Sequence, residues 1–590
     1  KLEVPRLKKD MISFINWFST YNVVPLGMAL RLVLLNKEAI EKINNNSFDQ
    51  FISSVVPKKF ILNDDQKKCL EQINKKEINF NVHVIEGVTG SGKTLVYFSR
   101  IKNLIDKGYQ ALILLPEIGL TSQFHKRFLE FFGFEPAIWH SGITKKNKKI
   151  IWRGVLENKI KAVVGARSSL FLPFNKLGII VVDEEHDSSY KQDEGIMYNA
   201  RDMAVSRASF EKIPINLVTS IPSIETFNNI KNKKYSISVL KKRYKDASLP
   251  KLEIIDLNLR KIPAHNWISS ETIKKVSEHL EKGDQILFFL NRRGFAPFVI
   301  CKNCHLKFLC PNCSVNLNYH KSKNILLCHY CGFKSALKRK CINNESCDFI
   351  FCGPGVERIA EELKIKFPKK NIEIFSSDSF KKKESNSIID KIENNKINIL
   401  VGTQLISKGF HFPKLNCIVV VDADFTSHGY DLRSAEKNIQ LYHQLSGRAG
   451  RFNSESLIIY QTLTPEDSTL NELIKNKSEQ LLKIELLTRK KNKLPPYVRL
   501  IAIIISSNQH DLSIMGAKEI KINLKKINNI EVLGPVDSPL LKIKKKFRSR
   551  LLLRFKSGVM IQKKITNLLN SLKISSKIKL TVDVDPVNFS

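Results

Sequence analysis

Apolar residues in this chain fall into short unbroken runs separated by stretches with helical spacing. The first group of runs lies at residues 82–85, 111–115, 161–165 and 179–182. A second group lies at residues 285–290, 397–401 and 417–421. A strand that is covered on both faces needs no polar side, so these runs are typical of parallel sheets flanked by helices. The pattern predicts an α/β fold with two parallel-sheet lobes.

Both ends of the chain depart from this alternation. Helical apolar spacing is present at residues 11–18 and 23–35. Apolar strands of a separate α+β domain are expected at residues 498–506, 531–536 and 551–555. We therefore expect a helical segment with a linker at 1–60, a first lobe at 61–235, a second lobe at 236–470 and a C-terminal domain at 471–590.

Length and charge narrow the class of protein. A chain of 590 residues is too long for a single core, and no apolar run approaches the ~20 residues that cross a bilayer. The formal charge is +39, from 96 Lys and Arg against 57 Asp and Glu, and such a field attracts phosphates. We expect a cytoplasmic protein that binds nucleic acid; lysines that only solvate the surface are the alternative. The basic stretch at 542–550 fits a solvated hairpin as well as a contact with DNA or protein.

A glycine-rich loop follows the first of these strands and precedes a helical stretch. Its residues are Gly87, Val88, Thr89, Gly90, Ser91, Gly92, Lys93 and Thr94. This spacing is the full phosphate-binding pattern, in which glycines let backbone N–H groups surround a phosphate. Lys93 would reach the terminal phosphates, and the Thr94 hydroxyl would bind Mg²⁺. The loop predicts a site for ATP with Mg²⁺.

Two further groups of polar residues carry the chemistry that such a loop needs. The run at 179–182 ends in Asp183 and Glu184, which we expect to hold Mg²⁺ and to act as general base. The second lobe has no phosphate loop, but it contains Arg448 and Arg451 beside glycines. We expect ATP in the cleft between the lobes, with these arginines stabilising charge on the transferred phosphoryl group.

Nine of the eleven cysteines form one cluster, at Cys301, Cys304, Cys310, Cys313, Cys328, Cys331, Cys341, Cys347 and Cys352. Three C-x2-C pairs without a secretory leader favour zinc in a reducing compartment over disulfides. We expect a zinc-binding insertion at 299–353 in the second lobe. One complete four-thiolate set consists of Cys310, Cys313, Cys328 and Cys331. A second site would use Cys301, Cys304 and Cys341, with Cys347 as the candidate fourth ligand.

These motifs, in this order, resemble those of the primosomal replication-restart helicases (primosomal protein N′), a family of superfamily 2 DNA helicases. The matching stretches are 87–94, 115–121, 140–142, 183–192, 289–297, 402–404, 408–409, 444–451 and 582–586. The likeness covers about residues 60–590, and the cysteine cluster is specific because few other helicases carry zinc there. The resemblance implies two RecA-like helicase lobes, zinc in the second, and a C-terminal α+β domain.

The resemblance also implies a function. Members of the family are ATP-driven 3′→5′ translocases that load the replicative helicase at abandoned forks, with primosome proteins and single-stranded DNA-binding protein as partners. It assigns adenine contact to Gln66, for which an ordinary glutamine on a helix surface is the alternative. It assigns contact with single-stranded DNA to an aromatic-rich loop that contains Tyr190, Lys191 and Tyr198. Aromatic rings stack on bases for about 1–3 kcal/mol each.

Several positions depart from the family pattern. The stretch Thr219-Ser220-Ile221-Pro222-Ser223 stands where the family has Gly-Ser-Ala-Thr-Pro-Ser, so we expect altered coupling in the first lobe. Met197 replaces a Trp, Val356 replaces a Thr, and Asn344 replaces the usual eighth cysteine. Fewer than sixty residues precede the lobes, so the family's N-terminal 3′-end-binding domain and winged helix are expected to be largely absent.

Two other functions stay open. One is an ATP-driven translocase that remodels protein–DNA complexes without separating strands. The other is a scaffold without hydrolysis that binds DNA and primosome partners through its zinc module. Drift would not be expected to spare the whole catalytic set, so its presence argues against the scaffold: Lys93, Asp183, Glu184, Arg448 and Arg451.

Overall fold

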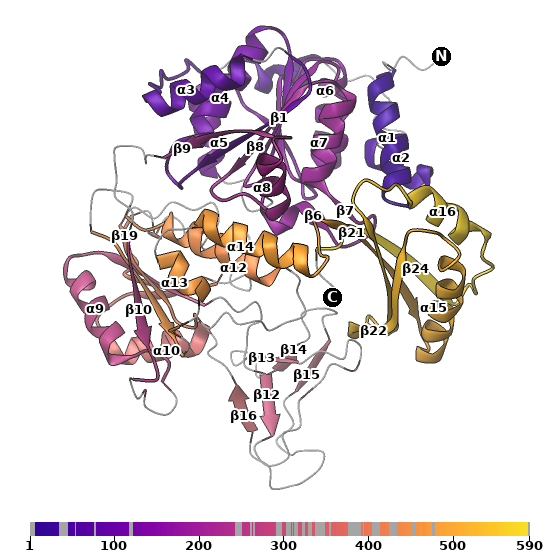
Figure 1. Ribbon diagram of the computed structural model, residues 1–590. Helices are drawn as coiled ribbons and strands as arrows, with labels where there is room; N and C mark the ends of the chain where they lie inside the picture. Colours follow the sequence, from indigo (N-terminus) through magenta and orange to yellow (C-terminus); the bar gives the residue numbers. More distant parts are fainter. Residues whose placement is uncertain are drawn as a thin grey trace.

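The computed structural model (Figure 1) describes most of the chain. The described residues are 6–34, 45–52, 55–75, 78–116, 122–241, 250–259, 262, 266–290, 298–301, 308, 311, 317–320, 325–327, 333–336, 349–352, 356–375, 391–392, 394–403, 414–423, 433–450, 455–463, 465–466, 468–474 and 478–587. None of the helices in these ranges is long and apolar enough to cross a membrane.

The first lobe is a seven-stranded parallel sheet in the order β3-β4-β2-β5-β8-β1-β9. Its strands are β1 (Asn81–Gly87), β2 (Gln110–Leu114), β3 (Ala137–Trp139), β4 (Ala162–Gly165), β5 (Leu177–Asp183), β8 (Pro214–Thr219) and β9 (Ser236–Leu240). Its helices are α3 (Asp64–Asn74), α4 (Lys93–Asp106), α5 (Ser122–Phe132), α6 (Lys145–Leu156), α7 (Ala200–Phe210) and α8 (Ile224–Lys231). Separate apolar clusters bury the two faces of the sheet, as its unbroken apolar strands require.

The second lobe is a six-stranded parallel sheet in the order β10-β20-β19-β11-β18-β17. Its strands are β10 (Lys251–Asp256), β11 (Gln285–Phe289), β17 (Ile372–Phe375), β18 (Ile399–Gly402), β19 (Leu415–Val420) and β20 (Leu457–Thr462). Its helices are α9 (Ser270–Glu281), α10 (Val356–Lys366), α12 (Ser434–Ser446), α13 (Ser468–Ile474) and α14 (Ser478–Lys491). The two predicted parallel-sheet lobes are confirmed.

Two predicted boundaries are wrong by a few elements. Strand β9 begins at Ser236, beyond the expected end of the first lobe, yet it pairs with β1 and completes that lobe's sheet. The expected boundary after residue 470 divides α13 and assigns α14 to the C-terminal domain, but Leu473 and Leu482 are buried in the core of the second lobe. Both errors have the same cause. Strand pairing and helix packing decide which lobe an element belongs to, and the local sequence does not reveal either of them.

An antiparallel module interrupts the second lobe between β11 and α10, and Figure 1 shows it projecting away from both lobes. Its strands are β12 (Phe298–Cys301), β13 (Asn318–His320), β14 (Ile325–Leu327), β15 (Lys334–Ala336) and β16 (Phe349–Cys352). The knuckle that contains Cys328 and Cys331 lies in sequence between β14 and β15. The side chains of all the predicted zinc ligands lie outside the described residues, so both predicted zinc sites stay predictions.

The C-terminal domain is an antiparallel sheet in the order β22-β23-β21-β24. It consists of β21 (Val498–Ser507), α15 (His510–Leu524), β22 (Glu531–Ile543), β23 (Lys546–Lys556), α16 (Gln562–Ser571) and β24 (Ile578–Val584). The basic stretch at 542–550 comprises the last two residues of β22, the turn that follows and the first half of β23. The predicted α+β domain is therefore present, with its basic residues on a hairpin.

The N-terminal helices pack at the junction of the first lobe and the C-terminal domain (Figure 1). They are α1 (Lys9–Tyr21) and α2 (Leu26–Val33), followed by a 3₁₀ segment, η2 (Asn45–Phe51). Phe14 and Phe18 are fully buried, and both rings pack against Phe171 of the first lobe. Because α1 also contacts α16, this segment joins the two domains.

Candidate active site between the two lobes

The phosphate-binding loop has the geometry that its sequence predicts. Strand β1 ends at Gly87, and α4 begins at Lys93. Gly92 is the N-cap of α4 with φ of 80°, a left-handed conformation that favours glycine. The Lys93 ammonium is buried in the loop, 2.6 Å from the Gly87 carbonyl oxygen and 3.4 Å from that of Val88. The loop therefore encloses the cation that would meet the terminal phosphates.

Gln66 braces this loop from α3. Its backbone N–H donates to Asn63 Oδ1 at 2.9 Å, and its side-chain carbonyl accepts from the Asn63 N–H at 2.9 Å, which is a capping box. Its amide nitrogen donates to the Ser91 carbonyl at 2.9 Å. Gln66 is fully buried, and a side chain on Gly92 would collide with its amide. The structure thus gives Gln66 a role in holding the loop; adenine contact stays a prediction.

Asp183 lies at the carboxyl end of β5, next to the loop. The Tyr97 hydroxyl of α4 donates to Asp183 Oδ2 at 2.9 Å, and the Glu184 N–H donates to Oδ1 at 2.9 Å. Burial and the negative charge of Glu184 raise the pKa of Asp183 to about 6, although Lys93 and Tyr97 oppose the rise. Sequence reasoning missed Tyr97, because a tyrosine on an apolar helix face is ordinarily a core residue.

Glu184 and Arg448 belong to opposite lobes, and the charge of Glu184 acts on Arg448. Glu184 has φ of 48°, which is unusual for a residue other than glycine, and its Oε2 atom is buried without a hydrogen-bond partner among the described residues. Arg448 follows α12 in the second lobe, and burial lowers its pKa to about 10 although Glu184 opposes the shift. A Cβ on Gly447 would overlap the Thr89 side chain, so the second lobe rests against the phosphate loop. Arg451 lies outside the described residues.

The residues at this interface fit ATP with Mg²⁺. A Cβ on Gly90 would meet nothing within 4 Å, so the loop is open at its tip. Lys93 supplies positive charge, and Thr94 and Asp183 supply oxygen ligands of the kind that Mg²⁺ prefers. Bound Mg²⁺ would neutralise charge on the transferred phosphoryl group. The buried Glu184 oxygen is the atom that would accept a proton from the attacking water.

Both ends of the altered stretch at 219–223 form hydrogen bonds with neighbouring side chains. The Thr219 hydroxyl donates to the Ile221 carbonyl at 2.6 Å, so His186 Nδ1, 2.7 Å away, is the donor to Thr219 Oγ1. His186 Nε2 then accepts from the Gln444 amide of the second lobe at 2.7 Å. At the other end, the Ser223 N–H donates to Glu185 Oε1 at 2.7 Å.

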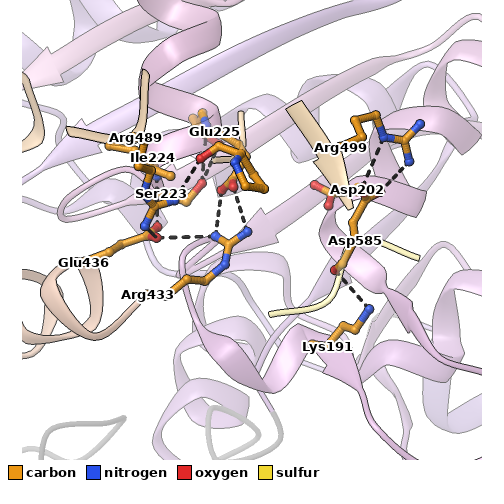
Figure 2. A network of polar contacts seen from close by, with 12 residues as sticks. Lys191, Asp202, Ser223, Ile224, Glu225, Arg433, Glu436, Arg489, Arg499 and Asp585 are labelled. Carbon is orange, nitrogen blue, oxygen red and sulfur yellow. Dashed lines mark hydrogen bonds and ion pairs between the residues drawn. The ribbon is translucent and has the colours of Figure 1, made fainter. Parts of the chain in front are cut away.

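Ion pairs join the lobes beside this contact, and Figure 2 shows them converging from α8, α12 and α14. Arg433 binds Glu225 through two hydrogen bonds of 2.7 and 2.9 Å. Glu436 accepts from the Ile224 N–H at 2.9 Å and pairs with Arg489 at 3.1 Å. We call Glu225, Arg433, Glu436 and Arg489 the inter-lobe bridge. Burial would raise the pKa of Glu225, but Arg433 and the neighbouring arginines outweigh it and lower that pKa to about 2.

The structure contradicts the predicted DNA contacts of the aromatic-rich loop. Tyr190 and Tyr198 are each 1% exposed, so neither ring is available to stack on a base. Tyr198 packs edge-on against Phe18 of α1. Lys191 is 4% exposed, and its ammonium is bound by the C-terminal domain at Asp583. The prediction is wrong because α1 and the C-terminal domain cover this loop, which its own sequence does not reveal.

Four family models match the chain. Residues 59–222 match "Type III restriction enzyme, res subunit", and residues 333–453 match "Helicase conserved C-terminal domain". Residues 310–335 match "PriA DNA helicase Cys-rich region (CRR) domain", which implies zinc, and residues 490–587 match "Primosomal protein N C-terminal domain". The helicase models imply the use of ATP and Mg²⁺ in the cleft described above.

Similar proteins span nearly the whole chain. The replication restart protein PriA of Rickettsia conorii is 39% identical over 603 residues, which cover 100% of this chain and 91% of that protein. That of Bacillus subtilis is 33% identical over 563 residues, which cover 94% of this chain and 70% of that protein. The solved structure of the DUF1998 helicase MrfA bound to DNA aligns with a TM-score of 0.43 at 17% identity, over 71% of this chain and 49% of that one, too loosely for a comparison in detail. The chain belongs to the PriA family of replication restart proteins and carries the two lobes of a superfamily 2 helicase.

Proposed function

We propose that this protein hydrolyses ATP between its lobes to move 3′→5′ along single-stranded DNA and to separate strands at stalled forks. The observation that carries the proposal is the close approach of Gly447, the residue before Arg448 in the second lobe, to Thr89 of the phosphate loop in the first. A site assembled from both lobes changes when they move apart, so each cycle of hydrolysis can open and close the cleft. Membership of the PriA family supports the setting in replication restart.

Each residue of the site has a role in this cycle. Lys93 binds the terminal phosphates, and Asp183 would hold the Mg²⁺ ion. The Asp183 carboxylate is fixed by the hydrogen bond that it accepts from the Tyr97 hydroxyl. Glu184 takes a proton from the attacking water through its buried Oε2 atom, which has no hydrogen-bond partner among the described residues and lies 3.6 Å from His186 Nε2. Arg448 stabilises charge on the phosphoryl group as the lobes close. Arg451, by its place in the motif, is expected to assist.

His186 and the inter-lobe bridge connect this chemistry to lobe movement. His186 binds Thr219 of its own lobe and Gln444 of the other, only two residues from the base Glu184. A change at the phosphates therefore reaches α12 through one side chain. We propose that the protein binds single-stranded and forked DNA across the lobes, in keeping with its charge of +39.

The zinc module and the partners complete the proposal. We propose that the module around β12–β16 binds up to two Zn²⁺ ions and serves strand separation or the loading of the replicative helicase, with primosome proteins and single-stranded DNA-binding protein as partners. Its projection from both lobes leaves it accessible to a second protein (Figure 1). Zinc per chain, measured in the purified protein, distinguishes one site from two.

The test is ATP hydrolysis with and without DNA, followed by strand displacement on forked duplexes with a 3′ or a 5′ single-stranded arm. We expect single-stranded DNA to stimulate ATP hydrolysis strongly. We also expect strand displacement to depend on whether the single-stranded arm is the 3′ or the 5′ arm. Stimulation without displacement would favour a translocase that remodels protein–DNA complexes. No stimulation in folded, zinc-loaded protein would overturn the motor and favour the scaffold.

A further inference from the structure

The last residues of the C-terminal domain bind Lys191, which lies eight residues after Asp183. The Lys191 ammonium lies 2.5 Å from Asp583 Oδ1, 3.0 Å from the Val584 carbonyl and 3.2 Å from the Asp585 carbonyl. An ammonium has three donors, and these three oxygens use all of them. Because Lys191 and Asp583 are both buried, the contact is withdrawn from water.

Tyr190, the neighbour of Lys191, reaches the catalytic strand. Its hydroxyl lies 2.6 Å from the Asp183 carbonyl and 2.9 Å from the Leu114 carbonyl, at the ends of β5 and β2. Those two strands are paired in the centre of the sheet. Two adjacent side chains therefore span the distance from the C-terminal domain to the backbone of the residue that would hold Mg²⁺.

The same tail is fixed at its other side. The Asp585 carboxylate accepts from Arg499 of β21 at 2.6 and 3.1 Å (Figure 2). It also accepts from the Tyr21 hydroxyl of α1 at 2.8 Å. The Asp585 N–H donates to the Leu500 carbonyl at 3.0 Å. Residues 583–585 thus form a short rigid connection, anchored in the C-terminal domain and ending on Lys191.

We propose that Asp583 and Lys191 are positioning residues for ATP hydrolysis: the C-terminal tail fixes Lys191, and Tyr190 thereby fixes the backbone of Asp183. The inference rests on the proposed hydrolysis of ATP in the cleft. It makes the C-terminal domain part of the ATPase, although none of its residues faces the nucleotide loop in the described structure. A displacement of that domain would move Lys191 and Tyr190, and with them the backbone of Asp183.

The test uses the full-length protein with three substitutions in this connection: Lys191→Met, Asp583→Asn and Tyr190→Phe. Each is expected to lower the kcat of ATP hydrolysis about tenfold while the KM for ATP changes less than twofold, because the phosphate loop is untouched. Combining Tyr190→Phe with Lys191→Met should lower kcat no further than the worse single change, since both act through one path. Asp583→Asn keeps the side-chain shape, so it serves if Lys191→Met does not fold.

Arg554→Met is the matched control. It removes a surface ion pair with Glu531 within the same domain, without a contact to the first lobe among the described residues, and should leave kcat unchanged. If Lys191→Met and Asp583→Asn lower the melting temperature but leave kcat at the wild-type value, the contact only holds domains together and the proposal is overturned. Additive losses of kcat in the double variant would overturn it as well. Failure of the proposed function is seen separately, as a wild-type protein that does not hydrolyse ATP.

Discussion

Replacing Arg433 by Met would break the inter-lobe bridge at its best-formed contact. Arg433 begins the turn that precedes α12 and binds both carboxylate oxygens of Glu225 on α8. At the other end of the 13-residue helix, about 20 Å away at 1.5 Å per residue, the chain reaches Arg448. A rigid helix that is held at its N-terminal end therefore also holds the position of Arg448, which follows its C-terminal end.

The magnitude follows from the burial of the pair. Removing one partner of a buried ion pair costs about 3–5 kcal/mol. Here the two side chains are 15% and 22% exposed, and Glu225 still has Arg201 at 3.9 Å after Arg433 is removed. We therefore expect a cost below that range, about 2 kcal/mol. If only the closed lobes hydrolyse ATP, about 2 kcal/mol corresponds to a loss of about thirtyfold in the rate.

The assay is a double-mutant cycle on DNA-stimulated ATP hydrolysis. Arg433→Met and Glu225→Gln should each lower kcat/KM by about tenfold to thirtyfold. The double variant should be no slower than the worse single variant, because the second change removes a contact that is already lost. Nucleotide binding in the absence of DNA should change little, since the phosphate loop belongs entirely to the first lobe.

Lys102→Met provides the comparison for a surface pair. Lys102 and Asp106 are 49% and 58% exposed on α4, and such helix pairs contribute about 0.3–0.5 kcal/mol. Rates of this variant should equal those of the wild type. Additive effects of Arg433→Met and Glu225→Gln, within about 0.5 kcal/mol, would refute the reasoning, because they would mean that the pair does not act between the lobes.

Three further outcomes are expected. Lys93→Ala should abolish hydrolysis with the fold intact; appreciable DNA-stimulated hydrolysis by this variant would contradict the assignment of the site. Asp183→Asn should also abolish hydrolysis but stabilise the nucleotide-free protein by about 1–3 kcal/mol in thermal unfolding at neutral pH, because burial and Glu184 disfavour the ionised carboxylate; a lower melting temperature would count against this. Chelation of zinc should spare much of the hydrolysis while impairing strand displacement, and equal loss of both would mean that the module is simply part of the fold.

The fold and the core of the nucleotide site could be predicted because their signals are local. Gly87, Lys93 and Thr94 act within one loop, and a strand that ends in Asp183 is visible as an apolar run followed by acids. The structure adds the hydrogen-bond partners that fix the position of each side chain, which such patterns do not contain. Tyr97, four residues after Lys93, is identified as a site residue only by the hydrogen bond that its hydroxyl donates to Asp183.

Contacts between distant parts of the chain could not be predicted. Glu225 and Arg433 are separated by 208 residues, and nothing in either neighbourhood marks them as partners. Tyr190, Lys191 and Tyr198 show the opposite error, since aromatic and basic residues in a loop have the composition of a DNA contact whether or not they are exposed. Their burial depends on α1 and on β24, at the two ends of the chain.

The joint between Tyr21 and Asp585 closes over 564 residues of sequence. During synthesis, α1 therefore emerges long before Asp585 exists, and Lys191 has no Asp583 to bind until the residues up to 583 have been synthesised. A polypeptide that stops short of residue 583 would contain both lobes and the phosphate loop, yet it would leave a lysine in an apolar interior without its carboxylate. Pairing of Lys191 with Asp583 thereby distinguishes a polypeptide that has been synthesised as far as β24 from a shorter one.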